Sequence, residues 1–307
     1  MAAAQPALIA VVGPTASGKS ALAVELAQAL GGEIISCDSL QVYRGLDIGS
    51  AKPTLAERAL VPHHLIDVAE PDSDFSAAAY AHMARAVLRE VAARKRLPIV
   101  VGGTGLYLRA LLTGLFAGPS RNAAFRARVD SMAARFGRAR IHRWLARVDP
   151  AAASRIDPND LVRSVRALEV FAATRQPISR HHGAAGDALT GFRIGVFGLD
   201  LDRAVLRRRV EARTQAMLDG GLLEEARVLL ARFPPELRPL RSVGYRQAVA
   251  VVRGDMDLVD ARRDMVTATM QYAKRQRTWF RHQVDAEWFA TAAEAQRGIE
   301  AWLEART

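Results

Sequence analysis

The chain of 307 residues has a single cysteine, Cys37, and this scarcity excludes two kinds of architecture. One cysteine cannot form an internal disulfide or a cysteine-rich zinc module, and low cysteine content is typical of a reducing compartment. Long hydrophobic runs are also missing, since no segment approaches the roughly 20 apolar residues that cross a membrane. The start, Met1 to Pro6, lacks the basic head of a secretion signal. We therefore expect a soluble, cytoplasmic monomer with no membrane partner.

Acidic residues are scarce in two stretches of this basic chain. The segment 121–186 has thirteen arginines and five acids, so it holds +8 of the net charge of +11. The segment 265–284 has no acid and places Lys274, Arg275, Arg277 and Arg281 beside Trp279. Each stretch alone favours nucleic acid only weakly, because solvated helix faces are commonly basic. The two stretches together point to a polyanionic partner.

The most informative pattern is the run Gly13-Pro14-Thr15-Ala16-Ser17-Gly18-Lys19-Ser20, which fits G-x-x-x-x-G-K-[ST]. It lies between a β-branched apolar run, 8–12, and a segment with helical spacing, 21–27. The glycines permit torsions that turn several N–H groups toward one anion, and the helix N-terminus adds positive charge. Lys19 can reach the outer phosphates, and Ser20 can hold a magnesium ion. The flanking strand and helix disfavour the alternative, a plain glycine turn.

The order of apolar segments predicts an α/β fold: a P-loop NTPase-like parallel sheet flanked by helices, with a small all-helical insertion domain. We expect residues 1–120 and 187–307 to form the catalytic core and residues 121–186 to form the insert. The expected strands lie at 8–12, 33–38, 65–68, 99–101 and 192–199 and near Trp288. The expected helices include 76–96, 202–218, 222–232, 245–253 and 258–282. Ligands should collect where the strands end, near Gly13, Asp38 and Thr104.

Several polar residues have positions suited to chemistry. Asp38 ends a strand on the side of the phosphate loop, so it is a candidate base, although a turn cap is equally compatible with its position. Thr104 follows two glycines at the next strand end, and it too could be a cap. Arg209 and Arg213 share a helix face and could clamp a leaving pyrophosphate. The pairs His63-His64 and 181–182 lack companions at metal-ligand spacing, so we interpret them as surface loop histidines.

Six motifs together resemble the bacterial tRNA dimethylallyltransferases, also called tRNA isopentenyltransferases, of the IPP transferase family. They match in order and spacing along the whole chain. The motifs are the phosphate loop, Asp38-Ser39-Leu40-Gln41-Val42-Tyr43, Asp47-Ile48-Gly49-Ser50-Ala51-Lys52-Pro53, Val101-Gly102-Gly103-Thr104, Ser242-Val243-Gly244-Tyr245-Arg246-Gln247 and Lys274-Arg275-Gln276-Arg277-Thr278-Trp279-Phe280-Arg281.

This resemblance implies transfer of a dimethylallyl group from dimethylallyl diphosphate to the exocyclic N6 amine of the adenosine on the 3′ side of the anticodon, tRNA position 37. Asp38 is then the general base, Thr104 helps to position it, and Arg213 assists the departing diphosphate. Residues 13–20 bind the diphosphate with Mg²⁺, with Ser20 as the expected metal ligand. A carboxylate base suits an adenine amine, which is a poor nucleophile because its lone pair is delocalised.

The resemblance also implies contacts with the tRNA anticodon stem-loop. Val162 and Val165 are apolar where the family pattern has polar residues, which leaves side-chain contact there to Arg163 and Arg166. The residues expected to contact tRNA are Asp38, Ser39, Leu40, Gln41, Arg126, Val162, Arg163, Ser164, Val165, Arg166, Arg241, Gly244, Tyr245, Arg246, Lys274, Arg275, Gln276, Arg277, Trp279 and Arg281.

Three other functions share part of this pattern. An isopentenyltransferase that acts on free adenine nucleotides has the phosphate loop and the aspartate, but it needs neither the helical insert nor the segment 274–281. A P-loop small-molecule kinase leaves the Val-Gly-Gly-Thr and Ser-Val-Gly-Tyr-Arg motifs unexplained. A nucleotide-switched RNA-binding protein would hydrolyse a nucleoside triphosphate without changing the mass of its RNA.

Overall fold

The computed structural model of the chain describes residues 5–116, 118–181 and 187–305. These residues form two compact units, each with its own hydrophobic core. Unit 1 comprises residues 1–112 and 189–307, and unit 2 comprises residues 113–188. Unit 2 thus extends beyond the insert expected from the sequence, by eight residues at its start and two at its end.

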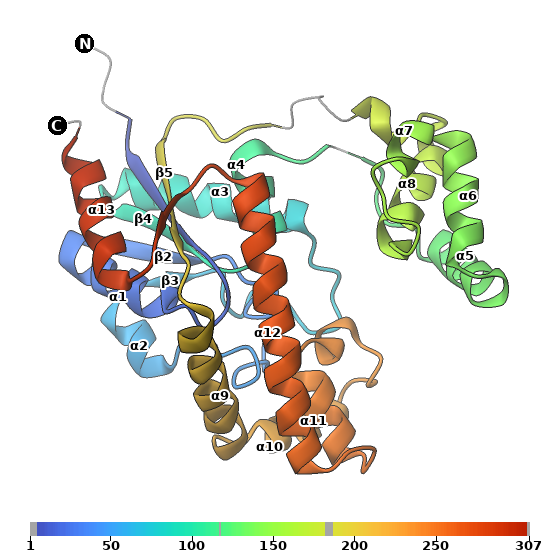
Figure 1. The fold of residues 1–307 in the computed structure, drawn as a ribbon. Coiled ribbons are helices and arrows are strands. Elements are labelled where there is room, and N and C mark those ends of the chain that lie inside the picture. Colours follow the sequence, from blue (N-terminus) through green and yellow to red (C-terminus); the bar gives the residue numbers. More distant parts are fainter. Residues whose placement is uncertain (1–4, 117, 182–186, 306–307) are drawn as a thin grey trace. The chain divides into compact units, whose positions relative to one another are not determined.

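Unit 1 is built on one all-parallel sheet, as predicted, with strand order β3-β2-β4-β1-β5-β6 (Figure 1). The strands are β1 (Ala7–Val12), β2 (Gly32–Ser36), β3 (His63–His64), β4 (Leu97–Val101), β5 (Arg193–Leu199) and β6 (Glu287–Phe289). The four central strands β2, β4, β1 and β5 are largely buried, which explains why they read as continuous apolar runs. The phosphate loop follows the central strand β1, so the sheet places it between neighbouring strand ends.

Helices cover both faces of this sheet. On one face α1 (Lys19–Leu30) and α13 (Ala292–Glu304) pack against alternate strand residues such as Ile9, Val11 and Ile99. The intervening residues point to the other face, where α3 (Ala77–Ala93) packs on β2 and β4. The side chain of Ser76 caps α3 by accepting a hydrogen bond from Ala79 N–H at 3.1 Å. The expected start of this helix is therefore confirmed.

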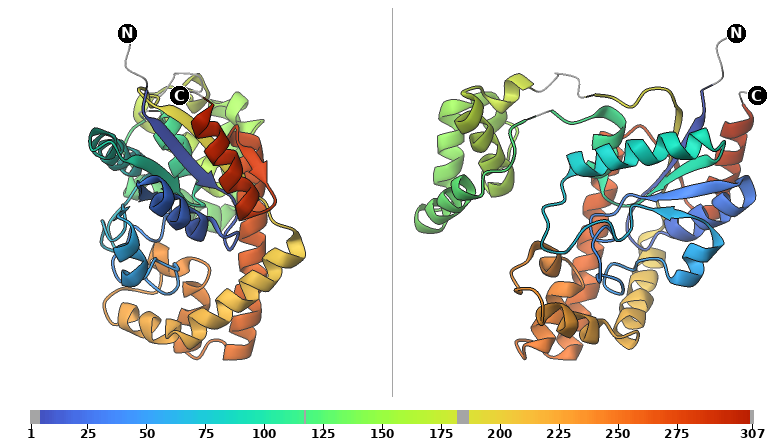
Figure 2. Two further views of the ribbon diagram at one scale, coloured as in Figure 1. Left: turned by 90° about the vertical axis from the view of Figure 1, so that its left-hand side faces the viewer. Right: turned by 180° about the vertical axis from the view of Figure 1, so that it is seen from behind.

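The remaining helices of unit 1 gather beyond the carboxyl ends of the strands (Figures 1 and 2). They are α9 (Arg203–Asp219), α10 (Leu222–Leu230), α11 (Tyr245–Val252) and the long α12 (Leu258–Gln283), with the 3₁₀ turn η2 (Arg238–Arg241). Helices α9 and α12 pack against each other. Two shorter helices, α2 (Leu55–Leu60) and α4 (Gly105–Thr113), lie in the connections after β2 and β4. Ligand-binding sites of open parallel sheets form at this edge.

Unit 2 is helical throughout its described residues. It contains α5 (Ala123–Phe136), α6 (Arg138–Val148), α7 (Pro150–Ala153), α8 (Leu161–Thr174) and the 3₁₀ turn η1 (Ile178–His181). The breaks fall at the expected aspartates, because Asp149 caps α7 and Asp160 caps α8 through their side chains. A small core that includes Val129, Ile141 and Leu168 holds the helices together.

Two sequence expectations were wrong. Residues 65–68 do not form a strand, because Leu65 and Asp67 have left-handed φ values of 61° and 58°; the short strand β3 precedes them. His63 and His64 lie in β3 and are partly buried, so they are not loop histidines. His64 Nε2 lies 2.7 Å from a carboxylate oxygen of the buried Glu33. Among the described residues, no helix combines the length and apolarity needed to cross a membrane.

Candidate active site

The phosphate loop joins β1 to α1 as its sequence predicts. Gly13 has φ 134°, and a β-carbon built there would lie 2.4 Å from the carbonyl oxygen of Leu199 on β5. Gly18, with φ 96°, starts α1, so the backbone can turn sharply on both sides of the loop. The guanidinium of Arg209, from α9, donates a hydrogen bond to Ser17 O at 3.1 Å. The loop is thus braced from the neighbouring strand and from α9.

Lys19 is the buried cation of this loop. Its Nζ donates to the Pro14 carbonyl at 2.6 Å and lies 3.5 Å from the Ser17 hydroxyl. Burial, reinforced by the nearby Arg213 guanidinium, lowers the pKa of Lys19 to about 7, and the Asp38 carboxylate partly opposes this shift. A negatively charged ligand beside Nζ would favour the charged ammonium. The electrostatics of the phosphate loop around Lys19 therefore favour the binding of an anion.

Asp38 and Thr104 are brought together at the adjacent ends of β2 and β4. Asp38 Oδ1 accepts hydrogen bonds from the N–H groups of Leu40 and Gln41, at 2.8 and 3.3 Å. The Thr104 hydroxyl accepts from Ser39 N–H at 3.0 Å. Both side chains therefore cap turns, which was the alternative to a chemical role. For Asp38 the cap fixes one oxygen of a carboxylate that also lines the cavity described below.

The turn after β4 needs its glycines because other groups approach its backbone closely. A β-carbon at Gly102 would lie 2.0 Å from the Cys37 carbonyl oxygen, and one at Gly103 would lie 2.2 Å from Nε2 of Gln276. At Gly105 it would lie 2.1 Å from the ring of Trp279. The Gly-Gly-Thr-Gly sequence thus lets β2 and α12 pack directly on this turn. Cys37 is buried, and burial raises the pKa of its thiol to about 12.

A cavity of about 350 Å³ lies inside unit 1 at this edge. It brings together the phosphate loop, the end of β2, the turn after β4, and side chains of α9 and α12. The Arg213 side chain is partly buried, and the loss of solvation lowers the pKa of its guanidinium despite the nearby Asp38 carboxylate. Lining residues are Thr15, Ala16, Gly18, Lys19, Ser20, Ala21, Asp38, Gln41, Ser50, Ala51, Val101, Gly102, Gly103, Arg209, Arg213, Tyr272 and Gln276.

Glu225, on α10, is a positioning residue that the sequence analysis missed. Its carboxylate accepts hydrogen bonds from three consecutive backbone N–H groups, those of residues 47–49, at 2.7 to 3.1 Å. It also accepts one from the Tyr245 hydroxyl at 2.6 Å. A β-carbon at Gly49 would lie 2.5 Å from the Tyr245 ring. Glu225 and Tyr245 thus hold the loop that carries the cavity residues Ser50 and Ala51. No spacing rule could have paired α10 with that loop.

The structure divides the expected RNA-contacting residues of unit 1 into exposed and internal ones. Lys274, Arg275 and Arg241 are exposed. Tyr245 and Gln276 are buried, with 0% and 6% of their surface exposed, and their polar groups bind within the protein. Trp279 is half-buried against Gly105, and Gly244, with φ 96°, starts α11.

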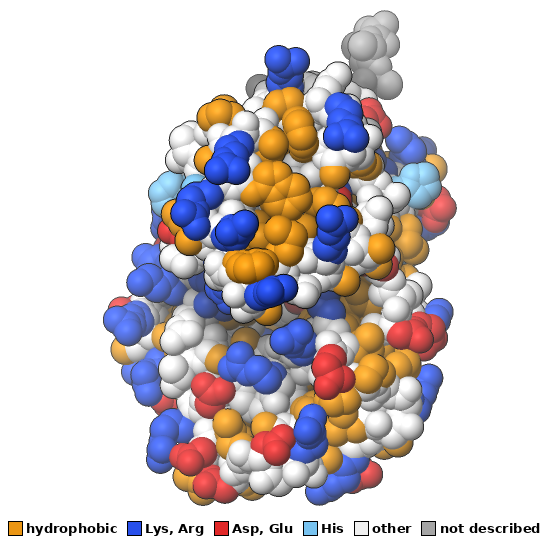
Figure 3. Space-filling view, turned by 90° about the vertical axis from the view of Figure 1, so that its right-hand side faces the viewer, with side chains coloured by type: hydrophobic (Ala, Val, Ile, Leu, Met, Phe, Trp, Pro, Cys, Tyr) orange, Lys and Arg blue, Asp and Glu red, His pale blue; other side chains and the backbone are white. Residues whose placement is uncertain are grey.

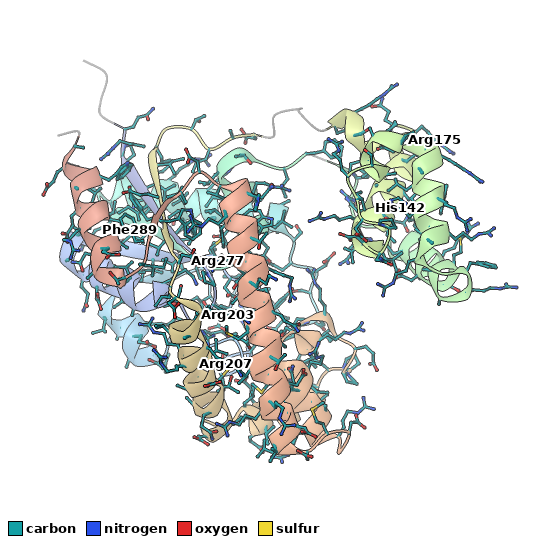
Figure 4. The ribbon with its side chains drawn as sticks, viewed as in Figure 1. His142, Arg175, Arg203, Arg207, Arg277 and Phe289 are labelled. Carbon is teal, nitrogen blue, oxygen red and sulfur yellow. The ribbon has the colours of Figure 1, made fainter. Side chains whose placement is uncertain are left out.

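Ion pairs hold three more of these arginines. Arg277 and Arg281, on α12, both pair with Asp200 at the end of β5, at 3.0 and 2.7 Å. Figure 4 labels Arg277 on α12 and, on α9, Arg203 and Arg207. Arg246 pairs with Asp264 at 3.1 Å. The charge of these residues is partly compensated inside the protein. Near the cavity, Gln41 bonds to the backbone of residues 50–51, and Ser39 and Leu40 are half-buried.

In unit 2 the expected RNA contacts divide in the same way. Val162 is 74% exposed and the Arg163 side chain is 68% exposed. Ser164 and Val165 are buried in the unit, and their contact with RNA stays a prediction. Arg126 and Arg166 both bind the carboxylate of Glu169, whose side chain is 2% exposed, at 2.7 to 2.8 Å. Their guanidiniums stabilise the unit itself.

The described residues contain no cluster of three or more histidine, cysteine or carboxylate side chains that could hold a metal ion. Asp38 is the one carboxylate among the described lining residues, and Ser20 adds a hydroxyl at the start of α1. Such a sparse set does not suit a calcium or zinc cage. It does suit Mg²⁺, which is commonly held by one or two protein oxygens together with substrate phosphates and water.

In each comparison with known proteins, the chain is similar to members of the same family. The sequence model of the IPP transferase family matches residues 41–283. A tRNA dimethylallyltransferase of Anaeromyxobacter sp. strain Fw109-5 is 52% identical over 94% of this chain and 96% of its own length. The tRNA isopentenylpyrophosphate transferase structure from Bacillus halodurans is 36% identical over 98% of both chains, with a TM-score of 0.71. A eukaryotic dimethylallyltransferase acting on tRNA is 26% identical over 98% of this chain and 80% of its own, with a TM-score of 0.80.

Proposed function

Because the chain belongs to the IPP transferase family, we propose that it transfers a dimethylallyl group from dimethylallyl diphosphate to a tRNA. The acceptor is the exocyclic N6 amine of the adenosine on the 3′ side of the anticodon, position 37. In the reaction a bond forms between N6 and the allylic carbon, the bond from that carbon to the diphosphate oxygen breaks, and N6 loses a proton. The observation that carries this proposal is the cavity in which the phosphate loop, Asp38 and Arg213 meet.

Asp38 takes the proton from N6. The hydrogen bonds from Leu40 and Gln41 hold its carboxylate at the cavity, so no side-chain reorientation is needed when the adenine arrives. Removing the proton as the new bond forms overcomes the weak nucleophilicity of an amine conjugated with the adenine ring. Thr104 contributes indirectly, because its hydroxyl anchors Ser39, the residue after Asp38.

The diphosphate binds the phosphate loop, residues 13–20. Negative charge grows on it as the allylic bond breaks, and buried cations stabilise this charge strongly in a site that excludes water. Lys19 comes from the loop and Arg213 from α9, so the leaving group lies between two elements. The ammonium of Lys19 becomes fully charged as the anion binds, since its pKa of about 7 then rises.

Ser20 would hold a Mg²⁺ ion through its hydroxyl, together with the diphosphate oxygens and water. The ion would neutralise part of the diphosphate charge and make it a better leaving group. Asp38 is then free for the proton, which matches the absence of further carboxylates among the described lining residues. Ser20 is exposed at the first turn of α1, so its hydroxyl can reach an ion beside the loop.

The tRNA anticodon stem-loop is held by exposed cations on both units. An adenosine in a loop must leave its stack to enter an enzyme pocket, so backbone contacts must compensate for the lost stacking. Arg163 on unit 2, and Arg241, Lys274 and Arg275 on unit 1, offer such contacts. On the face of unit 2 turned to the viewer in Figure 3, cationic side chains surround a hydrophobic patch. This pattern suits a phosphate backbone.

The test is mass spectrometry of tRNA nucleosides after incubation with dimethylallyl diphosphate and Mg²⁺. The expected result is one five-carbon addition on the adenosine at position 37. Asp38→Asn should lower the rate by at least about a hundredfold while tRNA binding stays unchanged. Prenylation of free AMP or ADP with unmodified tRNA would favour the free-nucleotide transferase. Phosphate transfer from ATP to a small molecule would favour a kinase.

A further inference from the structure

The buried side chain of Gln276 joins two loops that are far apart in sequence. Its Oε1 accepts a hydrogen bond from Thr15 N–H at 2.8 Å, and its Nε2 donates one to the Gly103 carbonyl at 2.9 Å. Thr15 belongs to the phosphate loop, Gly103 to the turn after β4, and Gln276 to the C-terminal half of α12. One amide therefore connects three elements of the cavity wall.

Each residue that Gln276 binds is close in sequence to a residue of the proposed site, Lys19 or Thr104. Thr15 is four residues before Lys19, in the half of the phosphate loop that Arg209 does not brace. Gly103 precedes Thr104, whose hydroxyl anchors the backbone beside Asp38. The distance between the diphosphate cradle and the proposed base is thus set partly through Gln276. The absence of a side chain at Gly103 makes this approach possible, since a β-carbon there would lie 2.2 Å from Nε2.

We infer that Gln276 is a positioning residue that locks the phosphate loop to the turn beside Asp38, and that it does not contact RNA. The inference rests on the proposed function. Lys274 and Arg275 precede Gln276 on α12 and are exposed, so one helix presents cations to solvent while it fixes the diphosphate site from inside.

Two other roles predict different results. If Gln276 contacted RNA, its loss would weaken tRNA binding and leave diphosphate binding intact. If it only packed α12 against the sheet, an apolar side chain of equal length would replace it. An amide that positions the loop cannot be replaced in this way, because the partly buried Thr15 N–H would lose its acceptor.

The experiment compares Gln276→Met, which keeps the length of the side chain, with Gln271→Met, which replaces an exposed glutamine of the same helix. For each we measure the KM for dimethylallyl diphosphate, the KM for tRNA, the affinity for inorganic diphosphate with Mg²⁺, and the melting temperature. Gln276→Met should raise the KM for dimethylallyl diphosphate and the Kd for inorganic diphosphate by about tenfold, the loss expected when a partly buried N–H loses its acceptor. The KM for tRNA and the properties of Gln271→Met should not change.

A second variant tests the link from its other end. Gly103→Ala displaces the Gln276 amide, so Gly103→Ala, Gln276→Met and the double variant should raise the Kd for inorganic diphosphate by similar factors. Multiplying effects in the double variant, or a raised KM for tRNA with normal diphosphate binding, would overturn the inference. A wild type that binds diphosphate but prenylates no tRNA would refute the proposed function alone, because the binding comparison still decides the role of Gln276. A wild type that binds no diphosphate would refute both.

Discussion

Replacing Glu169 by glutamine should selectively destabilise unit 2. The Glu169 carboxylate accepts hydrogen bonds from Asn122 N–H at 2.8 Å, from two nitrogens of Arg126 at 2.8 Å, and from Arg166 at 2.7 Å. Glutamine offers one acceptor oxygen and adds an NH₂ group that faces these donors. The guanidiniums of Arg126 and Arg166 would lose the carboxylate that they share. Removing one partner from a partly buried ion cluster is strongly destabilising.

The magnitude follows from the pKa of Glu169. Burial alone raises this pKa, but the hydrogen bonds from Arg126, Asn122 and Arg166 outweigh it and lower the pKa from 4.5 to about 2. At about 1.4 kcal/mol for each pKa unit, the ionised carboxylate stabilises the folded unit by about 3 kcal/mol. Because the folded-state pKa is the lower one, this stability is complete above about pH 5. It is lost as the pH falls through 4.5 toward 2.

Hydrogen exchange of the full chain measures this effect region by region, as a free energy of opening for each helix. For Glu169→Gln we expect amides of α5 and α8 to lose about 3 kcal/mol at pH 7. Amides of α1, in unit 1, are the internal control and should not change. The wild type should lose the same stability between pH 5 and pH 2.5, and the variant should not show that loss. A change below about 1 kcal/mol in unit 2, or an equal change in α1, would refute the reasoning.

Three further predictions concern the active site and the RNA surface. Lys19→Ala should raise the KM for dimethylallyl diphosphate and lower kcat, because the ammonium acts on the diphosphate both before and during bond cleavage; steady-state kinetics with unchanged constants would place the diphosphate elsewhere. Arg163→Ala should reduce the slope of log tRNA affinity against log salt by up to about 1, without altering exchange in α8; an unaltered slope would remove Arg163 from the interface. Glu225→Gln should lower kcat/KM about tenfold, because an NH₂ donor replaces one of the two oxygens that accept from the backbone N–H groups of residues 47–49; normal kinetics would mean that the loop keeps its shape without this carboxylate.

The parts of the fold and site that were predictable depend on local signals. Residues close together in the sequence determine three features: the phosphate loop, the apolar strand β1 before it, and the cap of α3 at Ser76. Asp38 and Thr104 were placed together because parallel strands end at a common edge. The basic composition of residues 121–186 and 265–284 was enough to single out unit 2 and α12 as candidate RNA-binding segments.

Other features depend on residues that are distant in sequence. The prediction of a strand at 65–68 was wrong because the backbone turns there. Asp67 has a left-handed φ and pairs with Lys52 and Arg58. Glu225 holds a loop about 180 residues before it, and Gln276 bonds to Thr15 across 261 positions. Neither pairing leaves a periodic pattern. Locally, the sequence shows only a glycine at each point of close approach: Gly49 faces Tyr245, and Gly103 faces Gln276.

Ion pairs also change what the charge count means for RNA binding. Arg277 and Arg281 share Asp200, whose side chain is 7% exposed, so this trio brings a net charge of +1 to the surface in place of +2. Lys274 and Arg275 have no carboxylate partner among the described residues, and Arg275 lies over the ring of Tyr272. An RNA phosphate binds most strongly to a cation that does not have to break an ion pair with a carboxylate first. Among the cations of α12, Lys274 and Arg275 should therefore contribute most to the salt dependence of tRNA binding, whereas Arg277 and Arg281 fix α12 to the end of β5.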